Sequence, residues 1–294
     1  MKNSKDFIKL FDLNIPSQEH FDYYIKQMSK TEKFKDIKNL IKLFEEADSQ
    51  IEDFYAYKME KSNEIINFIK TTNAYNELCY DNNLLDLPTN RTFTYEEGVK
   101  YVSVDLRSAN WVSLKKYDQF NELGNSYQEF LKSFGLPEVF VHSKYLRQFI
   151  FGNVNPKKQQ KVQRNMIQEV VRKFSDQFHV EGVKNDEVIF RFDRFSDIFK
   201  IYQCLDMAPA YVSPTDKFKV KIFTIKRVED FRIDTIYDVG GVELRKEMVS
   251  VSGQEFYLKL KQYITGESID IRDLYFKSDG KLALWMVDGL NVCI

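Results

Sequence analysis

The stretch YVSVDLRSANW, residues 101–111, joins a short apolar run to a polar segment. The run 100–105, KYVSVD, is short and valine-bearing, which is typical of a buried strand, and 108–117 can form a helix directly after it. The pattern therefore predicts that Asp105 lies at the C-terminal end of a strand, where open α/β sheets place their ligands. An aspartate at this position also caps a helix well, so the segment alone is compatible with either role.

Helical patterns dominate the chain before this stretch. Apolar residues recur at i, i+3, i+4 and i+7 within 37–44, and a second helical pattern covers 51–71. An antiparallel helix pair packed on a core accounts for both better than a coiled coil that binds a partner. We expect a helical region at 1–95 that ends in a connector at 82–90.

Helices and strands are mixed in the segment 96–212. A long helix is expected at 157–174, and two strands at 177–183 and 187–192 form a hairpin through the turn Lys184-Asn185-Asp186. A further helix is expected at 195–205.

The segment 213–294 is rich in strand patterns. We expect strands at 218–229 and 281–287, and one helix near 254–264. The fold class predicted for the whole chain is α+β, with an N-terminal helical region, a central antiparallel sheet with helices and a β-rich C-terminal unit.

The composition sets broad limits on the function. With 43% hydrophobic and 15% aromatic residues, the 294-residue chain can build a substantial core. The formal net charge of -1 excludes a global polyanion-binding character, so any nucleic-acid surface must come from local clusters. The 3 cysteines are far apart, which predicts reduced thiols and a cytoplasmic location. We expect no signal peptide and no membrane partner. Frequent Lys, Asn, Ile, Phe and Tyr hint at a phage or viral origin.

A basic stretch follows Asp105 in the sequence. Residues 144–173 contain eight basic side chains against one acid, Glu169. This density suits a phosphate backbone or a triphosphate, and the interleaved Tyr145, Phe149 and Phe151 could stack on a base. The alternative is a solvated basic helix face with the aromatic side chains in the core.

The expected hairpin carries a second acidic position. In FHVEGVKNDEVIFRF, residues 178–192, Asp186 and Glu187 lie at the turn between two apolar strands. Two carboxylates held rigidly in this way can supply oxygen ligands to Mg²⁺, although a polar hairpin tip explains the same residues. Together with Asp105 and the basic stretch between them, they match the layout of two-metal phosphoryl transfer.

The three segments resemble motifs A, B and C of family A DNA polymerases and single-subunit phage-type RNA polymerases. Motif A of the family reads VSxDYSQIELR against VSVDLRSANWV here, motif B reads RxxxKxxxFGxxYG against SKYLRQFIFGNVNP, and motif C reads VHDExVxE against VKNDEVIFRF. The chain departs from the family at Ser143, at Asn155-Pro156 and at Asn110, which stand where the family has arginine, Tyr-Gly and glutamate.

This resemblance implies a minimal palm at 96–212 with short fingers, a thumb-like region at 1–95 and a role for each matched residue. Asp105, Asp186 and Glu187 would be catalytic, with Asp105 and Asp186 binding Mg²⁺ or Mn²⁺. The implied nucleotide-binding residues are Lys144, Arg147, Phe151 and Gly152. The residues expected to bind nucleic acid are Lys157, Lys158, Lys161 and Arg164.

The sequence thus favours a metal-dependent nucleotidyltransferase that adds nucleotides to a nucleic-acid 3′ end. Its partners would be a nucleoside triphosphate and DNA or RNA, either single-stranded or as primer and template. Two alternatives use the same residues: a non-catalytic nucleic-acid-binding protein with a degenerate palm, and a metal-dependent nuclease.

Overall fold

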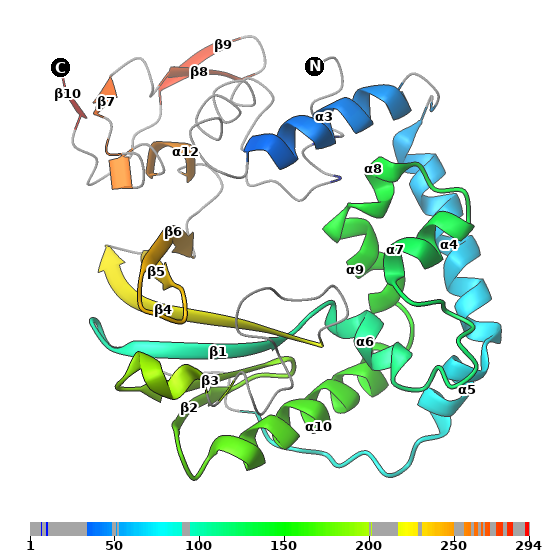
Figure 1. Ribbon diagram of the computed structural model, residues 1–294. Helices are drawn as coiled ribbons and strands as arrows, with labels where there is room; N and C mark the ends of the chain where they lie inside the picture. Colours follow the sequence, from blue (N-terminus) through cyan, green and yellow to red (C-terminus); the bar gives the residue numbers. More distant parts are fainter. Residues whose placement is uncertain are drawn as a thin grey trace. The chain divides into compact units, whose positions relative to one another are not determined.

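The structure is a computed structural model (Figure 1), and it describes residues 34–48, 51, 53–89, 95–199, 217–228 and 231–249. It also describes Phe7, Leu10, Ile201 and short pieces between 256 and 293. The chain divides into two compact units. The first contains Met1–Glu60, Gly135–Arg147 and Ser250–Ile294, and the second contains Lys61–Phe134 and Gln148–Val249.

The first unit is held together by stacked aromatic side chains between short helices. It contains α3 (Phe34–Asp48), the beginning of α4 (Phe54–Thr71), α8 (Glu138–Val141), the beginning of α9 (Lys144–Gly152) and α12 (Phe256–Lys259). The Phe44 ring stacks on Phe54 at 4.8 Å between centroids, and Phe54 stacks on Phe140 at 5.5 Å. Such contacts between large apolar rings supply most of the burial that fixes helices this short.

Two small sheets also belong to the first unit. β7 (Ile269–Asp270) pairs in parallel with β10 (Val292–Cys293), and β8 (Tyr275–Ser278) pairs antiparallel with β9 (Lys281–Leu284). The predicted strand at 281–287 is therefore found over 281–284, and the predicted helix at 254–264 is found as α12. The other positions of these two predictions are partly outside the described residues.

The second unit is built on a six-stranded antiparallel sheet with the strand order β2-β3-β1-β4-β5-β6. The strands are β1 (Lys100–Leu106), β2 (His179–Val183), β3 (Glu187–Phe192), β4 (Phe218–Val228), β5 (Phe231–Tyr237) and β6 (Glu243–Val249). The helices of this unit are the rest of α4, α5 (Asn73–Tyr80), α6 (Ala109–Lys115), α7 (Tyr127–Ser133), the rest of α9 and α10 (Pro156–Phe174), with the 3₁₀ turn η2 at Phe195–Asp197. The α+β class predicted from the sequence is confirmed.

The two faces of β1 differ in chemistry, because side chains alternate along a strand. Val102, Val104 and Leu106 are buried on one face, and the α10 side of the sheet carries Phe174 packed at 6.0 Å from Phe190. Tyr101, Ser103 and Asp105 alternate with these residues and therefore lie on the opposite face. Tyr101 on this second face packs in an apolar cluster with Ile189 and Phe223, and Asp105 lies at the end of the same face.

The observed units differ from the division expected from the sequence at 95/96 and 212/213. β4 pairs directly with β1, so β4, β5 and β6 continue the central sheet, whereas β7 to β10 belong to the first unit. The helical stretch 61–80 likewise belongs to the sheet-containing unit. Pairing between strands more than 100 residues apart leaves no local signal in the sequence.

Helix boundaries agree with the expected positions within a few residues. α10 begins at Pro156 because the Asn155 side chain accepts a hydrogen bond from the Lys158 N–H and proline suits a first helical position. The helix expected at 195–205 is found as the turn η2 followed by helical positions at 198, 199 and 201, and the rest lies outside the described residues. Within the described part of the chain, no helix has both the length and the apolar character needed to cross a membrane.

Candidate active site

The pairing of β1 with β3 brings three acidic residues together. Asp105 lies directly opposite Glu187 in the antiparallel register, and Asp186 immediately precedes β3. The Leu106 N–H donates to the Asp186 carbonyl oxygen at 2.8 Å, which fixes the hairpin turn against the end of β1. The acids that the sequence places 81 residues apart therefore lie on neighbouring strands, as expected from the resemblance to a palm.

The environment of Asp105 disfavours a negative charge. Burial raises the pKa of Asp105 most, the charges of Asp186 and Glu187 raise it further, and the result is a pKa of about 7. Lys219, which lies opposite Asp105 on β4, and Lys184 lower it only in part. A shift of this direction means that burial and the neighbouring acids together outweigh the two lysines.

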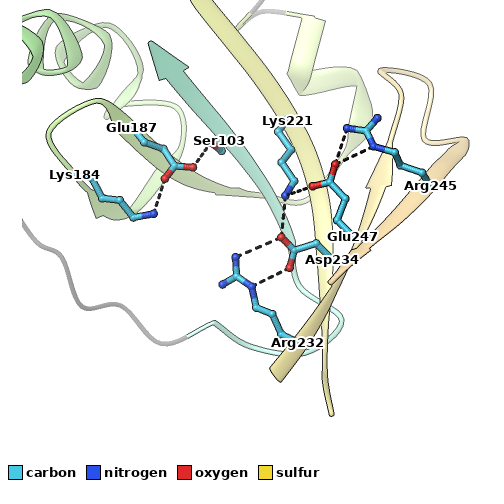
Figure 2. Close-up of polar contacts among 8 residues, drawn as sticks. All are labelled: Ser103, Lys184, Glu187, Lys221, Arg232, Asp234, Arg245 and Glu247. Carbon is cyan, nitrogen blue, oxygen red and sulfur yellow. Dashed lines mark hydrogen bonds and ion pairs between the residues drawn. The ribbon is translucent and has the colours of Figure 1, made fainter. Parts of the chain in front are cut away.

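Glu187 is held by two neighbours, as Figure 2 shows. One carboxylate oxygen accepts a hydrogen bond of 2.5 Å from the Ser103 hydroxyl, and the other accepts one of 2.6 Å from the Lys184 ammonium group. Burial alone would lower the pKa of Lys184, but its hydrogen bond and charge interaction with Glu187 raise it. Since both of its oxygens are engaged, Glu187 is suited to support the site, and Asp105 and Asp186 are left to contact a ligand.

The donor set fits a small hard cation that completes its shell with substrate oxygens. No group of three or more Asp, Glu, His or Cys side chains in the described residues is arranged to hold a metal by itself. Mg²⁺ commonly binds through only one or two carboxylates together with waters and substrate phosphates. Asp105 and Asp186 could supply two such carboxylates, and the raised pKa of Asp105 makes it a candidate functional residue.

Helix α10 ties the two acidic segments to each other. Its Arg164 Nε donates to the Asn185 side chain at 2.7 Å, in the turn beside Asp186. One residue earlier, the buried Gln163 donates at 3.0 Å to Asn110, at the beginning of α6. Helix α10 is thus joined by side-chain hydrogen bonds to the segments that resemble motifs A and C.

Three of the four cations expected to bind nucleic acid contact the connector at 81–87 instead. The Lys158 ammonium donates to the Asp81 carbonyl at 2.7 Å, and Lys161 and Arg164 lie 3.7 and 3.6 Å from the Asp86 carboxylate. The connector thus supplies acids and carbonyl oxygens to this helix face, and the expected contacts of these cations with nucleic acid stay a prediction. Lys157 is exposed.

The nucleotide-binding residues predicted from motif B separate into different environments. Phe151 is fully buried, with its ring centroid 5.1 Å from Trp111 and 6.1 Å from Phe130, so its expected contact with a base or sugar is wrong. Gly152 lies beside Asn110, whose amide nitrogen would be 3.2 Å from an added Cβ. Lys144 and Arg147 belong to the first unit, and their contact with a triphosphate stays a prediction.

A second charged group on the same sheet was not anticipated from the sequence. Asp234 is completely buried and is bound by Lys221 at 2.9 Å and by the Arg232 Nε at 2.9 Å (Figure 2). Glu247 accepts contacts from Lys221 at 3.1 Å and from Arg245 at 2.7 Å. The alternation of basic and apolar residues in 218–229 is a signal that could have placed Lys219 and Lys221 on a common face of the strand.

A cavity of about 440 Å³ lies away from the acids. It is lined by Gln177, Phe178, His179, Arg191, Phe192, Asp193 and Asp197. These residues lie around the C-terminal end of β3, whereas Glu187 is at its N-terminal end. The cavity therefore does not form part of the candidate active site.

No protein-family model matches the chain, and no curated protein or solved structure matches it.

Proposed function

We propose that this protein is a metal-dependent nucleotidyltransferase that extends a nucleic-acid 3′ end, with Asp105 and Asp186 at its centre. The observation that carries the proposal is the convergence of Asp105, Asp186 and Glu187 on neighbouring antiparallel strands. The pKa of Asp105, which burial and the neighbouring charges of Asp186 and Glu187 raise to about 7, supports it. A site of this kind gains stability when a divalent cation enters it.

Each protein group has a defined task in this proposal. Mg²⁺ or Mn²⁺, once bound, would supply charge stabilisation to the attacking and leaving oxygens. Asp105 and Asp186 would hold the cation, and Glu187 would keep the hairpin in place through Ser103 and Lys184. Arg164 holds the turn that carries Asp186 by its hydrogen bond to Asn185. The resemblance to family A polymerases adds the nucleoside triphosphate and the nucleic-acid strand as substrates.

The structure supports the two alternative functions to different degrees. A protein that only binds nucleic acid through α10 is less well supported, because Lys158, Lys161 and Arg164 are engaged by the connector. A nuclease would use the same carboxylates. The geometry of the acids favours neither nucleotide addition nor hydrolysis of the strand.

One incubation separates these functions. A labelled primer, alone and annealed to a template, is incubated with Mg²⁺ or Mn²⁺ and with each ribo- and deoxynucleotide triphosphate in turn. Lengthening of the primer is the expected result. Shortening would identify a nuclease, and retention of an unchanged primer under all conditions would overturn the catalytic proposal.

A further inference from the structure

Arg107 is a second polar side chain at the end of β1 that the site described above does not use. It follows Asp105 by two residues, and its N–H donates to the Lys217 carbonyl at 2.9 Å. This bond continues the β1–β4 register by one step beyond Leu106 and Phe218. Because successive residues of a strand alternate between faces, Arg107 occupies a position of the same parity as Asp105.

One nitrogen of the half-buried Arg107 side chain lacks a hydrogen-bond partner among the described residues. Its Nε atom is enclosed by the protein and has no hydrogen-bond partner among the described residues. Asp105 lies two positions away, yet no ion pair joins Arg107 to any acid in the described part of the chain. A buried donor without a partner costs about 1–3 kcal/mol, so such a group in a folded protein calls for a specific explanation.

The backbone next to Arg107 is also unusual. Ser108 adopts the left-handed conformation, with φ 49° and ψ 50°, which costs a residue other than glycine on the order of 1–3 kcal/mol. The Trp111 and Val112 N–H groups both donate to the Ser108 carbonyl, at 2.7 and 3.1 Å, and hold this conformation in place. The turn therefore holds the backbone of Arg107 in a fixed position two residues after Asp105, and strain of this kind gathers where a ligand is bound.

We propose that Arg107 binds a phosphoryl oxygen of the substrate beside Asp105. This inference rests on the proposed function, because it assigns a phosphate ligand to the same site. Arginine stays charged at all relevant pH values and offers a planar fork of donors that matches two phosphate oxygens. The phosphate belongs either to a free nucleoside triphosphate or to the phosphodiester backbone of the nucleic acid.

Binding measurements with Ca²⁺ in place of Mg²⁺ test this assignment without turnover. The probes are a fluorescent nucleoside triphosphate and a labelled single-stranded 12-nucleotide oligonucleotide, each titrated with the wild-type protein, Arg107→Ala and Arg107→Lys. Arg194, with a side chain that is 80% exposed, supplies the matched control Arg194→Ala. A lost charge-assisted contact predicts that Arg107→Ala weakens one probe about tenfold to a hundredfold. Arg107→Lys, which keeps the charge without the fork, should fall between Arg107→Ala and the wild type.

The two probes distinguish the source of the phosphate, and the thermal melt distinguishes binding from structure. Weakened triphosphate binding supports the nucleotide as the source, and weakened oligonucleotide binding supports the strand. Because the Nε has no partner to lose, Arg107→Ala should melt within a degree or two of the wild type or above it. Unchanged affinity for both probes, a clear loss of melting temperature, or no binding of either probe by the wild type overturns the assignment.

The proposed function and this inference can fail separately. Primer extension by the wild type with normal probe binding by Arg107→Ala would remove Arg107 from the site and leave the activity in place. Probe binding that depends on Arg107 without extension under any condition would support the phosphate site and overturn nucleotidyl transfer.

Discussion

Two groups of charged side chains lie on the central sheet of the second unit. In one group basic side chains pair with the acids, and in the other the acids outweigh their basic neighbours. In the first group, three basic side chains surround Asp234 and Glu247. Burial alone would raise the pKa of Glu247, but its contacts with Lys221 and Arg245 lower that pKa to about 2. At Asp105, burial and two further acids raise the pKa to about 7. Figure 2 shows the group around Asp234 and Glu247, and it also shows Glu187 with its partners Ser103 and Lys184.

This difference separates a structural cluster from a candidate binding site. A buried acid that is fully paired by its own chain has no need of a ligand, and removing one member exposes the others to the full cost of desolvation. A group of acids without enough basic neighbours is destabilised until a proton or a cation arrives. The predictions below use substitutions of similar size in the two groups.

The largest expected effect is on folding, at the paired group. Asp234→Asn would leave Lys221 and Arg232 without their buried carboxylate, and breaking such a pair costs about 3 to 5 kcal/mol of unfolding free energy. Urea unfolding of this variant beside the wild type measures the loss. A change below about 1 kcal/mol would show that Asp234 is not the charge on which the cluster depends.

The next effect is on catalysis, at the acidic group. Asp105→Asn and Asp186→Asn keep the side-chain size but remove a negative cation ligand, so primer extension should fall at least roughly a hundredfold in each. Both variants should fold and still bind an oligonucleotide. Near-normal extension by both would mean that these aspartates are not the metal site.

The same Asp105→Asn variant should change stability in a pH-dependent way. The folded pKa of about 7 lies above the ordinary value, so the wild type loses stability as the pH rises from about 4 through 7. Asparagine carries no charge, and without metal the variant should be more stable than the wild type by roughly 4 kcal/mol at pH 8 and equal to it near pH 4. Thermal melts across this range in a chelating buffer test the sign. A variant that is less stable at pH 8 would contradict the unbalanced charge of the site.

Whether a feature of the structure could be predicted from the sequence depends on whether neighbouring residues encode it. β1, the β2–β3 hairpin and the position of Asp105 at a strand end were predicted, because strand length, turn residues and apolar alternation are encoded within a few residues. The pairing of β4 with β1 was missed, since it joins segments more than 100 residues apart. The burial of Phe151 and the partners of Lys158 and Lys161 depend on tertiary neighbours, and no spacing within 144–173 indicated them.

The smallest expected effect concerns the basic helix. Lys157 is exposed, whereas Lys161 lies beside Asp86. Lys157→Ala should therefore lower the slope of log affinity against log salt for a single-stranded oligonucleotide by up to about 0.7, the value for one phosphate contact. Lys161→Ala is the matched control and should change the slope less. Equal changes in both variants would show that the connector releases Lys161 when nucleic acid binds.

The central claim is that Asp105 lies in a buried acidic group whose charge a divalent cation would balance, and a carboxyl titration tests it most directly. The protein is labelled with ¹³C at the aspartate side-chain carboxyls, and the Asp105 signal is assigned by its absence from the Asp105→Asn spectrum. The structure predicts a midpoint near pH 7 without metal, and a large downward shift when Mg²⁺ is added. A midpoint near 4 that Mg²⁺ leaves unchanged would contradict the claim.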